Sequence, residues 1–229
     1  VLILELIEKE KIRSSLFVPA VILFLVSIPQ AAETDFSSLK FVLYGASPIA
    51  DDTILKAKEI MKCDLFQVYG LTETAGAITI LMPEDHDPEK GKLRSCGKAL
   101  NSVEIKVVDD EGNEVKTGDI GEVISKSPLN MKGYWNRPDA TEEAIKDGWF
   151  YSGDAGFFDD EGYLYIHDRV KDMIGSVGEN IYPAEVENAL MSHPEIADAA
   201  VIGVPDDKWG ESVKGFVAVS YTHLTLPTT

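Results

Sequence analysis

A hydroxyl and a carboxylate follow an apolar run in the string QVYGLTE, residues 67–73. The run Leu65–Tyr69 is typical of a strand, and Gly70 allows a sharp turn after it. Thr72 and Glu73 would then lie at the carboxyl end of the strand, where open α/β sheets bind ligands. A hydroxyl beside a turn can hold a phosphate oxygen, whereas the neighbouring carboxylate repels phosphate unless Mg²⁺ lies between them. From spacing alone, a turn with a helix cap is the simpler interpretation, and a Mg²⁺–phosphate site is the alternative.

Two further strings carry charged residues at expected turns. In GWFYSGD, residues 148–154, Asp154 follows a glycine in a loop after an aromatic strand. Its carboxylate can accept two hydrogen bonds from a ribose diol, although an aspartate that caps its own turn is the simpler interpretation. In HDRVKD, residues 167–172, charges directly follow the apolar run Tyr163–Ile166. Taken alone, this third string indicates a solvated, charged turn.

The elements that position these strings change along the chain. Up to about Leu93, strands and helices alternate, as in an α/β layer. The expected helices are Leu2–Lys9, one beginning at Pro19, and Asp51–Met61, and the expected strands are Ser15–Val18, Phe41–Tyr44 and Leu65–Tyr69. Residues 93–168 indicate a small β-rich subdomain, with strands at 103–108 and 120–126 and tight turns at 110–113 and 159–162. Beyond residue 170, a helix at 183–191 and strands at 199–204 and from 213 predict a mixed segment.

The composition is that of a protein with a sizeable core and an acidic surface. Hydrophobic residues make up 45% of the 229 residues, and the formal net charge is −18. Such acidity argues against nucleic acid as a partner, because phosphates are repelled. Cys63 and Cys96 have no metal-ligand spacing, so neither a zinc site nor a disulfide framework is expected.

No membrane or export signal is expected in this sequence. The longest apolar stretch, residues 16–28, is too short to span a bilayer and is split by Pro19, so we expect a buried strand and helix there. The first residues carry no signal-peptide pattern, and the expected location is the cytoplasm. Because the chain begins on Val1 within a helical pattern, we expect its natural start to lie further upstream.

The three strings, in this order and with these gaps, resemble the superfamily of adenylate-forming enzymes. This superfamily comprises acyl- and aryl-CoA synthetases, adenylation domains of peptide synthetases, and luciferases. Supporting matches are GASP at residues 45–48, GYWNRP at 133–138 and GVPD at 203–206. The resemblance covers residues 1 to about 218 and is closest to bacterial fatty-acid and medium-chain acyl-CoA ligases.

The resemblance implies an α/β fold in which residues 1–168 are the C-terminal part of a large AMP-binding domain. Residues 169–218 would begin a small, mobile α+β domain. The implied reaction joins a fatty acid to ATP, giving acyl-AMP and pyrophosphate, and then forms a thioester with coenzyme A. ATP or AMP, Mg²⁺ and coenzyme A are therefore the implied cofactors and co-substrates, with no role for nucleic acid.

The same resemblance assigns roles to individual residues. The implied nucleotide-binding residues are Gly45, Ala46, Ser47, Tyr69, Gly70, Thr72, Asp154, Ile166, Arg169 and Gly178. Among them, Tyr69 would lie against the adenine, Thr72 would bind phosphate, and Asp154 would take the ribose hydroxyls with help from Arg169. The implied catalytic residues are Thr72, Glu73 and Lys171, with Glu73 binding Mg²⁺ and Lys171 at the hinge of the small domain. Gly178 would belong to a loop that closes on the pantetheine arm.

Several features depart from the family pattern. The family's phosphate loop would lie upstream of Val1 and its catalytic lysine downstream of residue 218, so residues 1–229 are expected to be an inactive fragment. Val177 stands where the family usually has a glycine. Residues 219–229, VSYTHLTLPTT, carry no charge and resemble a translated transposase adapter used for DNA sequencing libraries, so we exclude them from the native chain.

Two other functions remain open from the sequence. A carrier-protein-loading adenylation domain, such as a fatty-acyl-AMP ligase, would use the same nucleotide residues with a different acceptor. A non-catalytic module that kept only the nucleotide site is the other. The length of the acyl chain is not encoded in any of these strings.

Overall fold

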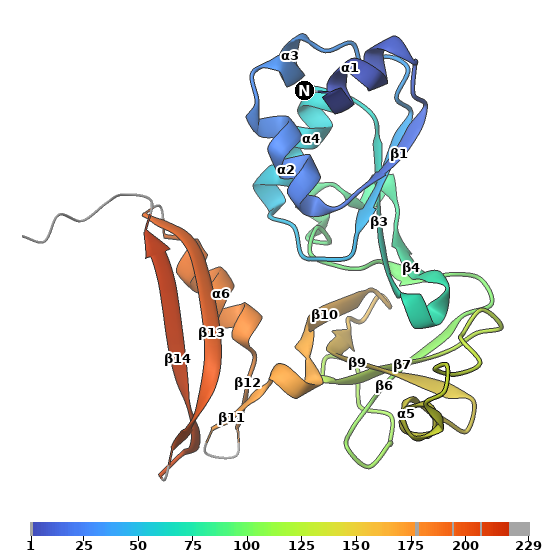
Figure 1. The fold of residues 1–229 in the computed structure, drawn as a ribbon, viewed down its shortest axis with the longest axis vertical. Coiled ribbons are helices and arrows are strands. Elements are labelled where there is room, and N and C mark those ends of the chain that lie inside the picture. The colour runs from blue at the N-terminus through green and yellow to red at the C-terminus, as the bar shows by residue number, and fades with distance from the viewer. Residues whose placement is uncertain (1, 177–178, 194, 207, 220–229) are drawn as a thin grey trace, which may run out of the picture. The chain divides into compact units, whose positions relative to one another are not determined.

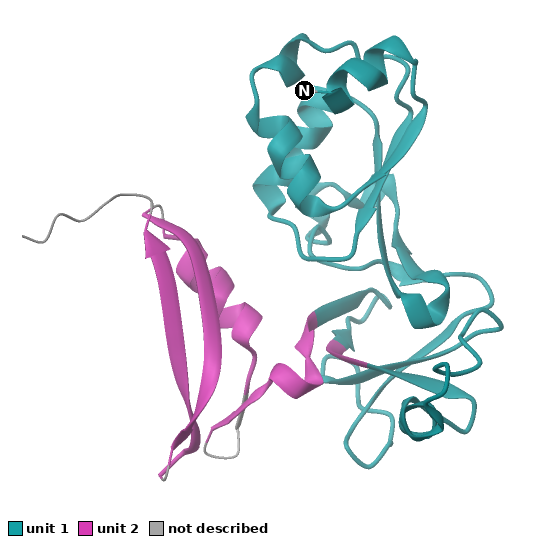
Figure 2. Ribbon diagram, viewed as in Figure 1, with its two compact units in different colours: residues 1–152, 157–166 teal, residues 153–156, 167–229 magenta. Residues whose placement is uncertain are grey.

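The computed structural model describes residues 2–176, 179–193, 195–206 and 208–219. It divides into two compact units, shown in Figure 2. Unit 1 comprises residues 1–152 and 157–166, and unit 2 comprises residues 153–156 and 167–229.

Unit 1 begins with a five-stranded sheet and the helices that pack on it (Figure 1). The strand order is β1 (Ser14–Phe17), β2 (Phe41–Gly45), β3 (Asp64–Leu71), β4 (Gly76–Leu81) and β5 (Lys98–Ala99). β1, β2 and β3 are parallel, and β4 and β5 continue the sheet in antiparallel fashion. The helices are α1 (Leu2–Lys9), α2 (Pro19–Ser27), α3 (Gln30–Glu33) and α4 (Asp51–Met61).

The core of this layer follows from sequence periodicity. In α4 the buried positions Ile54, Ala57 and Met61 recur at helical spacing and form one stripe. In β2 the buried residues Val42 and Tyr44 alternate with less buried neighbours and so share one face of the strand. All five belong to one core cluster, so the crossover helix covers the parallel strands.

The β-rich part of unit 1 is built on a second sheet. Its strands are β6 (Glu104–Val108), β7 (Gly121–Lys126), β9 (Trp149–Phe158) and β10 (Leu164–Arg169), in the order β10-β9-β7-β6, with β8 (Ile145–Lys146) paired to β9. Residues 153–156 of β9 and 167–169 of β10 are counted with unit 2. The helix α5 (Pro138–Ala144) begins at a proline, which is preorganised for a first helical turn. Three short 3-10 helices of unit 1 are η1 (Thr72–Thr74), η2 (Pro83–Asp85) and η3 (Pro88–Lys90).

Unit 2 contains an antiparallel sheet and one longer helix. The strand order is β12 (Glu179–Ile181), β11 (Ile174–Ser176), β14 (Gly210–Val219) and β13 (Ile196–Asp206). The 3-10 helix η4 (Val170–Asp172) precedes β11, and α6 (Pro183–Met191) precedes β13. β13 and β14 form a long ribbon that pairs from Ile196 and Val219 to Asp206 and Gly210.

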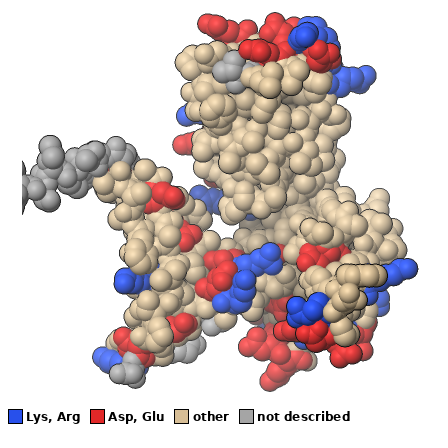
Figure 3. Space-filling model, viewed as in Figure 1, with Lys and Arg blue, Asp and Glu red and all other residues tan. Residues whose placement is uncertain are grey.

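A largely uncharged surface covers the α/β layer of unit 1 in Figure 3. Among the exposed apolar side chains of the α/β layer are Leu23 and Phe24 of α2, which are 55% and 53% exposed, and Leu16 of β1 at 67%, so the burial expected for residues 16–28 is wrong at these positions. α2 is apolar on nearly every face, a pattern typical of a helix that is buried on more than one side. Exposed apolar patches of this kind mark contact surfaces with other protein segments.

The α/β fold class expected from the sequence is confirmed. The predicted helices at 51–61 and 183–191 have the predicted bounds, and β3 extends two residues beyond its predicted end. β4, β5, α5, β11 and β12 were not predicted. Among the described residues, no helix is both long and apolar enough to cross a membrane.

Candidate nucleotide site

The carboxyl ends of β2 and β3 meet at one edge of the first sheet. Gly45, the last residue of β2, is paired with Val68 of β3, so residues 46–48, which follow β2, begin beside Tyr69 of β3. A Cβ atom at Gly45 would lie 2.0 Å from the carbonyl oxygen of Val68, which explains the glycine without a ligand. Ala46, which follows it, has a φ of 72°. Left-handed backbone at a non-glycine residue is costly and is concentrated at functional sites.

Gly70 has a different role from the one that the sequence suggested. β3 does not end at Tyr69 but continues to Leu71, with an irregularity between Tyr69 and Gly70. A Cβ atom at Gly70 would lie 2.0 Å from the carbonyl oxygen of Gly76 in the neighbouring strand. The expected sharp turn at Gly70 is therefore wrong: this glycine permits close approach of β4, and the chain turns later.

The turn itself is η1, Thr72–Thr74, which is closed by Ala75 at a φ of 53°. Thr74 is fully buried; its Oγ1 accepts a hydrogen bond from the Leu71 amide at 2.9 Å and donates to the Gly76 carbonyl at 2.7 Å. This side chain ties the end of β3 to the start of β4. Thr72 is consequently exposed and Glu73 half-buried, both directly after the strand end.

Glu73 is held by a segment that lies far away in the sequence. The phenol of Tyr134 donates a hydrogen bond of 2.8 Å to Oε1 of Glu73. The amide of Met131 donates to the backbone carbonyl of Glu73 at 2.6 Å. The metal-binding candidate therefore has its backbone and its side chain fixed by residues 131–134.

Tyr69 and Ile166 meet at the small core of the second sheet. The buried members of this core are Val107, Val123 and Leu164, and both Tyr69 and Ile166 pack against them. Two residues that the resemblance assigns to nucleotide binding are thus brought to one hydrophobic cluster of unit 1. Their positions in the sequence, on β3 and β10, gave no direct indication of this proximity.

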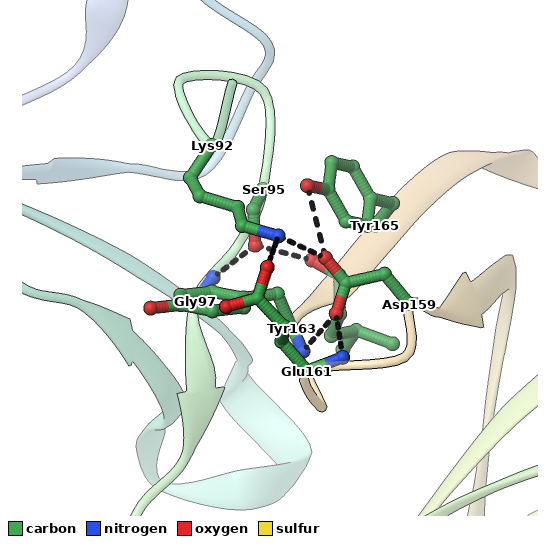
Figure 4. A network of polar contacts seen from close by, with 8 residues as sticks. Lys92, Ser95, Gly97, Asp159, Glu161, Tyr163 and Tyr165 are labelled. Atoms are coloured by element: carbon green, nitrogen blue, oxygen red, sulfur yellow. Dashed lines mark hydrogen bonds and ion pairs between the residues drawn. The ribbon is translucent and has the colours of Figure 1, made fainter. Parts of the chain in front are cut away.

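A polar network joins the two layers of unit 1 beside this core (Figure 4). Lys92 Nζ lies 2.7 Å from carboxylate oxygens of both Asp159 and Glu161. These hydrogen bonds raise the pKa of Lys92. The backbone continues the connection, because the Cys96 amide donates to the Leu164 carbonyl at 2.7 Å. The network fixes β10, and with it Ile166, against the α/β layer.

A buried histidine supports β2 immediately before the loop of residues 46–48. His86 Nδ1 lies 2.8 Å from the Met82 carbonyl, and Nε2 lies 2.8 Å from the hydroxyl of Tyr44. Because a carbonyl only accepts, Nδ1 carries the hydrogen and the Tyr44 hydroxyl donates to Nε2 of a neutral ring. Burial lowers the pKa of His86, and the charge of nearby Lys58 adds to that shift, which outweighs the hydrogen bond to Met82. Lys58 also donates to the His86 carbonyl at 2.7 Å. His86 therefore connects α4, through Lys58, with β2, through Tyr44.

Unit 2 holds the proposed ribose pair. Arg169 Nε lies 3.1 Å from Oδ1 of Asp154, whose side chain is only 9% exposed. The predicted loop at Asp154 is wrong, because this residue lies inside β9, after Gly153 at a φ of 71°. The glycine allows a local left-handed residue within the strand, so the turn-like string did not end it.

The other two residues of unit 2 that the sequence predicted for the site are Lys171 and Gly178. Lys171 is exposed in η4, a few residues after the division between the units at residues 166 and 167. It lines a cavity of about 370 Å³ together with Asp168, Glu187 and Glu211. Each of these carboxylates accepts a backbone amide hydrogen bond within unit 2, from Ala184, Val201 and Gly175, respectively. Gly178 and Val177 lie outside the described residues.

The donors present in unit 1 suit a magnesium ion that is shared with a nucleotide. The described residues contain no group of three or more His, Cys, Asp or Glu side chains that could hold a metal. Mg²⁺ is commonly bound by one or two carboxylates together with substrate phosphates. A single oriented carboxylate at Glu73, with the Thr72 hydroxyl beside it, fits this mode of binding.

Comparison with solved structures gives the class of protein. The amide bond synthetase McbA from Marinactinospora thermotolerans superposes with a TM-score of 0.88 at 36% identity, over 99% of this chain and 46% of that chain. The o-succinylbenzoate–CoA synthetase from Bacillus subtilis, solved in complex with ATP and magnesium ion, gives a TM-score of 0.83 at 35% identity, over 96% of this chain and 44% of that chain. The fold is therefore that of the adenylate-forming enzymes.

Sequence comparison gives the family. Residues 1–135 match the model of the AMP-binding enzyme family, and residues 185–227 match the AMP-binding enzyme C-terminal domain. The chain belongs to the AMP-binding enzyme family, as its motifs predicted. The second match overlaps residues 219–229, and their foreign origin stays a prediction.

Characterised relatives differ in their acceptors. A fatty acid–[acyl-carrier-protein] ligase from Streptomyces coeruleorubidus is 40% identical over 94% of this chain and 42% of its own length. A long-chain-fatty-acid–CoA ligase from Mycobacterium tuberculosis is 40% identical over 96% of this chain and 43% of its own length. The chain thus spans less than half the length of these relatives and is part of a family of acyl- or aryl-CoA and acyl-carrier-protein ligases.

Sequence reasoning missed four residues that shape the site. Thr74 fixes the turn after β3, His86 supports β2, Lys92 joins the two layers of unit 1, and Tyr134 holds Glu73. Only Tyr134 carried a signal, since it lies in the GYWNRP string that resembles the family. His86 contacts Tyr44, 42 residues away, and Lys92 contacts Asp159, 67 residues away, so no local pattern indicates these contacts. The partners of Thr74, Leu71 and Gly76, are local, but the string around it gave no sign that its hydroxyl closes the turn.

Proposed function

We propose that this chain is part of an ATP-dependent acyl-CoA ligase that acts on a carboxylic acid, with fatty acids as the substrate class. The support is the Thr72–Glu73 turn at the end of β3, together with relatives whose names include a long-chain-fatty-acid–CoA ligase. In the first half-reaction, a substrate carboxylate oxygen forms a bond to the α-phosphorus of ATP and pyrophosphate leaves. In the second, the sulfur of coenzyme A attacks the acyl carbon and AMP leaves.

Each proposed residue has a task that its surroundings permit. Tyr69, held on the small core, would lie against the adenine, with the backbone of Gly45, Ala46 and Ser47 beside it. The Thr72 hydroxyl would bind phosphate, and Glu73 would hold Mg²⁺, which supplies positive charge to the phosphate oxygens when bound. Both half-reactions build negative charge on oxygens, so such positioned groups act mainly in the transition state.

The ribose and hinge roles are proposed for unit 2. Asp154 would accept hydrogen bonds from the ribose hydroxyls, with Arg169 orienting its carboxylate. Lys171 would lie at the pivot about which the small domain turns between the half-reactions. We retain the proposed division into residues 1–168 and 169–218 on this basis.

The observation that carries the proposal is the doubly fixed Glu73 beside an exposed hydroxyl. The test uses the full-length protein with a panel of fatty acids. Acid-dependent exchange of labelled pyrophosphate into ATP, followed by AMP release that depends on coenzyme A, is the expected result. A protein that bound ATP without any acid-dependent exchange would be a non-catalytic nucleotide module, and the proposal would be rejected.

An acyl-carrier-protein acceptor is the second candidate, because the Streptomyces relative is a fatty acid–[acyl-carrier-protein] ligase. The same experiment distinguishes them at its second stage. Formation of acyl-CoA supports the first candidate, whereas transfer only to a phosphopantetheinylated carrier protein supports the second. Residues 1–229 alone are proposed to catalyse neither stage, and hydroxamate trapping of an acyl-AMP by this fragment would contradict that proposal.

A further inference from the structure

Residues 131–134 form a clip around Glu73. The clip holds the residue at two points, the carbonyl through the Met131 amide at 2.6 Å and Oε1 through the Tyr134 phenol at 2.8 Å. Tyr134 and Glu73 are 61 residues apart, so the contact depends on the folded arrangement of unit 1. A phenol that donates to a carboxylate forms a charge-assisted hydrogen bond, which is shorter and stronger than a neutral one.

The clip is itself anchored, which distinguishes it from a chance contact of a surface tyrosine. The Tyr134 amide donates to Oγ1 of Thr141 at 2.9 Å, and that hydroxyl donates to the Arg137 carbonyl at 2.8 Å. Gly133 has a φ of 150°, and a Cβ atom there would lie 2.6 Å from Cγ2 of Thr141. On the other side, Asn130 Nδ2 donates to the Ser125 carbonyl of β7 at 3.0 Å. The backbone that presents the phenol is therefore fixed from α5 and β7.

We propose that Tyr134 is a positioning residue that orients the Glu73 carboxylate for a divalent cation. The hydroxyl holds Oε1 and so restricts rotation of the carboxylate, which would leave Oε2 to bind the cation. Because phenol is neutral, it fixes the geometry without cancelling the negative charge that attracts the metal. This inference rests on the proposed function, since it assigns a partner to the proposed metal ligand.

A structural role is the competing explanation. In that case the clip would only join η1 to the β-rich layer, and removing the phenol would lower the melting temperature without changing metal binding. The two roles separate in a direct binding measurement. Partners of metal ligands commonly change metal affinity by about 10- to 100-fold, and we expect a smaller change here because Tyr134 is 39% exposed.

The test is a double-mutant cycle in the full-length protein with Tyr134→Phe, Glu73→Gln and the pair of substitutions. Binding of Mn²⁺ in the presence of a non-hydrolysable ATP analogue is measured by electron paramagnetic resonance, and binding of AMP without metal by calorimetry. We expect Tyr134→Phe to raise the Mn²⁺ dissociation constant by about three- to ten-fold and to leave AMP binding unchanged. In the Glu73→Gln background, the same substitution should have no further effect on Mn²⁺.

The matched control is Tyr151→Phe, which removes a phenol elsewhere in the β-rich layer and should change neither quantity. Thermal unfolding of each variant shows that it is folded. Normal Mn²⁺ affinity in Tyr134→Phe, with or without a lower melting temperature, would overturn the positioning role. If the unsubstituted protein itself bound no Mn²⁺ with the nucleotide analogue, the proposed function would be rejected as well. Normal Mn²⁺ binding by both the unsubstituted protein and Tyr134→Phe would reject only the positioning role.

Discussion

The sheet edge of unit 1 and the ion pair of unit 2 present their carboxylates in different ways. Glu73 lies in a 3-10 turn directly after a strand, and a neutral phenol donates to it at 2.8 Å. Asp154 lies inside a long strand, nearly buried, with the guanidinium of Arg169 at 3.1 Å. The charge of the first carboxylate is oriented but not neutralised, whereas the charge of the second is largely offset.

This difference matches the chemistry proposed for each residue. A carboxylate whose neighbour is neutral keeps its attraction for a cation, so Glu73 suits Mg²⁺. A carboxylate paired with arginine is fixed in plane and still accepts hydrogen bonds, so Asp154 suits a neutral diol. The comparison predicts that substitutions at the first site change metal dependence, while those at the second change nucleotide affinity independently of metal.

Apart from substitutions at the metal site, the largest loss of activity is expected from a substitution of Lys171, which lies in the segment that follows the division between the units. In the full-length protein, Lys171→Pro should spare acyl-AMP formation and reduce thioester formation by about 100-fold or more, because proline fixes φ and resists the hinge rotation. The two half-reactions are assayed separately, with Lys116→Pro in an exposed loop of the β-rich part as the control. Equal loss in both half-reactions would show that Lys171 is not the pivot.

Asp154→Ala is expected to weaken AMP binding by about one to two orders of magnitude, because a charge-assisted contact is worth about 1.5–3 kcal/mol. Calorimetry of AMP binding, with and without Mg²⁺, measures the change. Asp160→Ala, on the exposed turn after β9, is the control and should leave the affinity unaltered. An Asp154→Ala protein that binds AMP normally would remove the ribose assignment and the contrast with Glu73.

The smallest effect concerns pH and the buried His86. Its pKa is below the ordinary value of 6.5 in the folded state, so the unfolded chain binds a proton more readily. The stability that the neutral ring contributes is present above about pH 6.5 and is lost as the pH falls below that value. Urea unfolding between pH 7.5 and 5.5 should therefore show a steeper loss of stability than in His86→Gln. Exposed His193→Gln is the control, and an identical slope in His86→Gln would contradict the assignment.

Most of the first sheet could be predicted because its signals are local. The apolar run before Gly70 and the helical stripe of residues 51–61 each lie within a dozen residues, and both elements were found. β4, residues 76–81, was missed because the turn before it could not be predicted. Ala75 closes that turn at a positive φ, a conformation that is not typical of alanine. Asp154 was placed in a loop because a glycine such as Gly153 is typical of a turn. In the structure, both residues lie within β9.

The site was predictable only in part for a related reason. Thr72, Glu73 and Asp154 are conspicuous by type and spacing, so they were selected. The residues that hold them in place are not conspicuous in the sequence, because their contacts are long-range. Glu73 and Tyr134 are 61 positions apart, and Lys92 and Asp159 are 67 apart. Chemistry-bearing groups can be read from short strings, whereas the groups that orient them depend on the three-dimensional fold.

The central claim is that Glu73 is the metal-binding carboxylate of an adenylate-forming site. The most direct test is pyrophosphate release by the full-length protein, measured across a range of Mg²⁺ concentrations, for Glu73→Gln and for the exposed control Glu59→Gln on α4. We predict that Glu73→Gln folds normally, releases pyrophosphate about 100- to 1,000-fold more slowly, and requires more Mg²⁺, while Glu59→Gln is unaffected. An unchanged rate and an unchanged metal dependence in Glu73→Gln would contradict the claim.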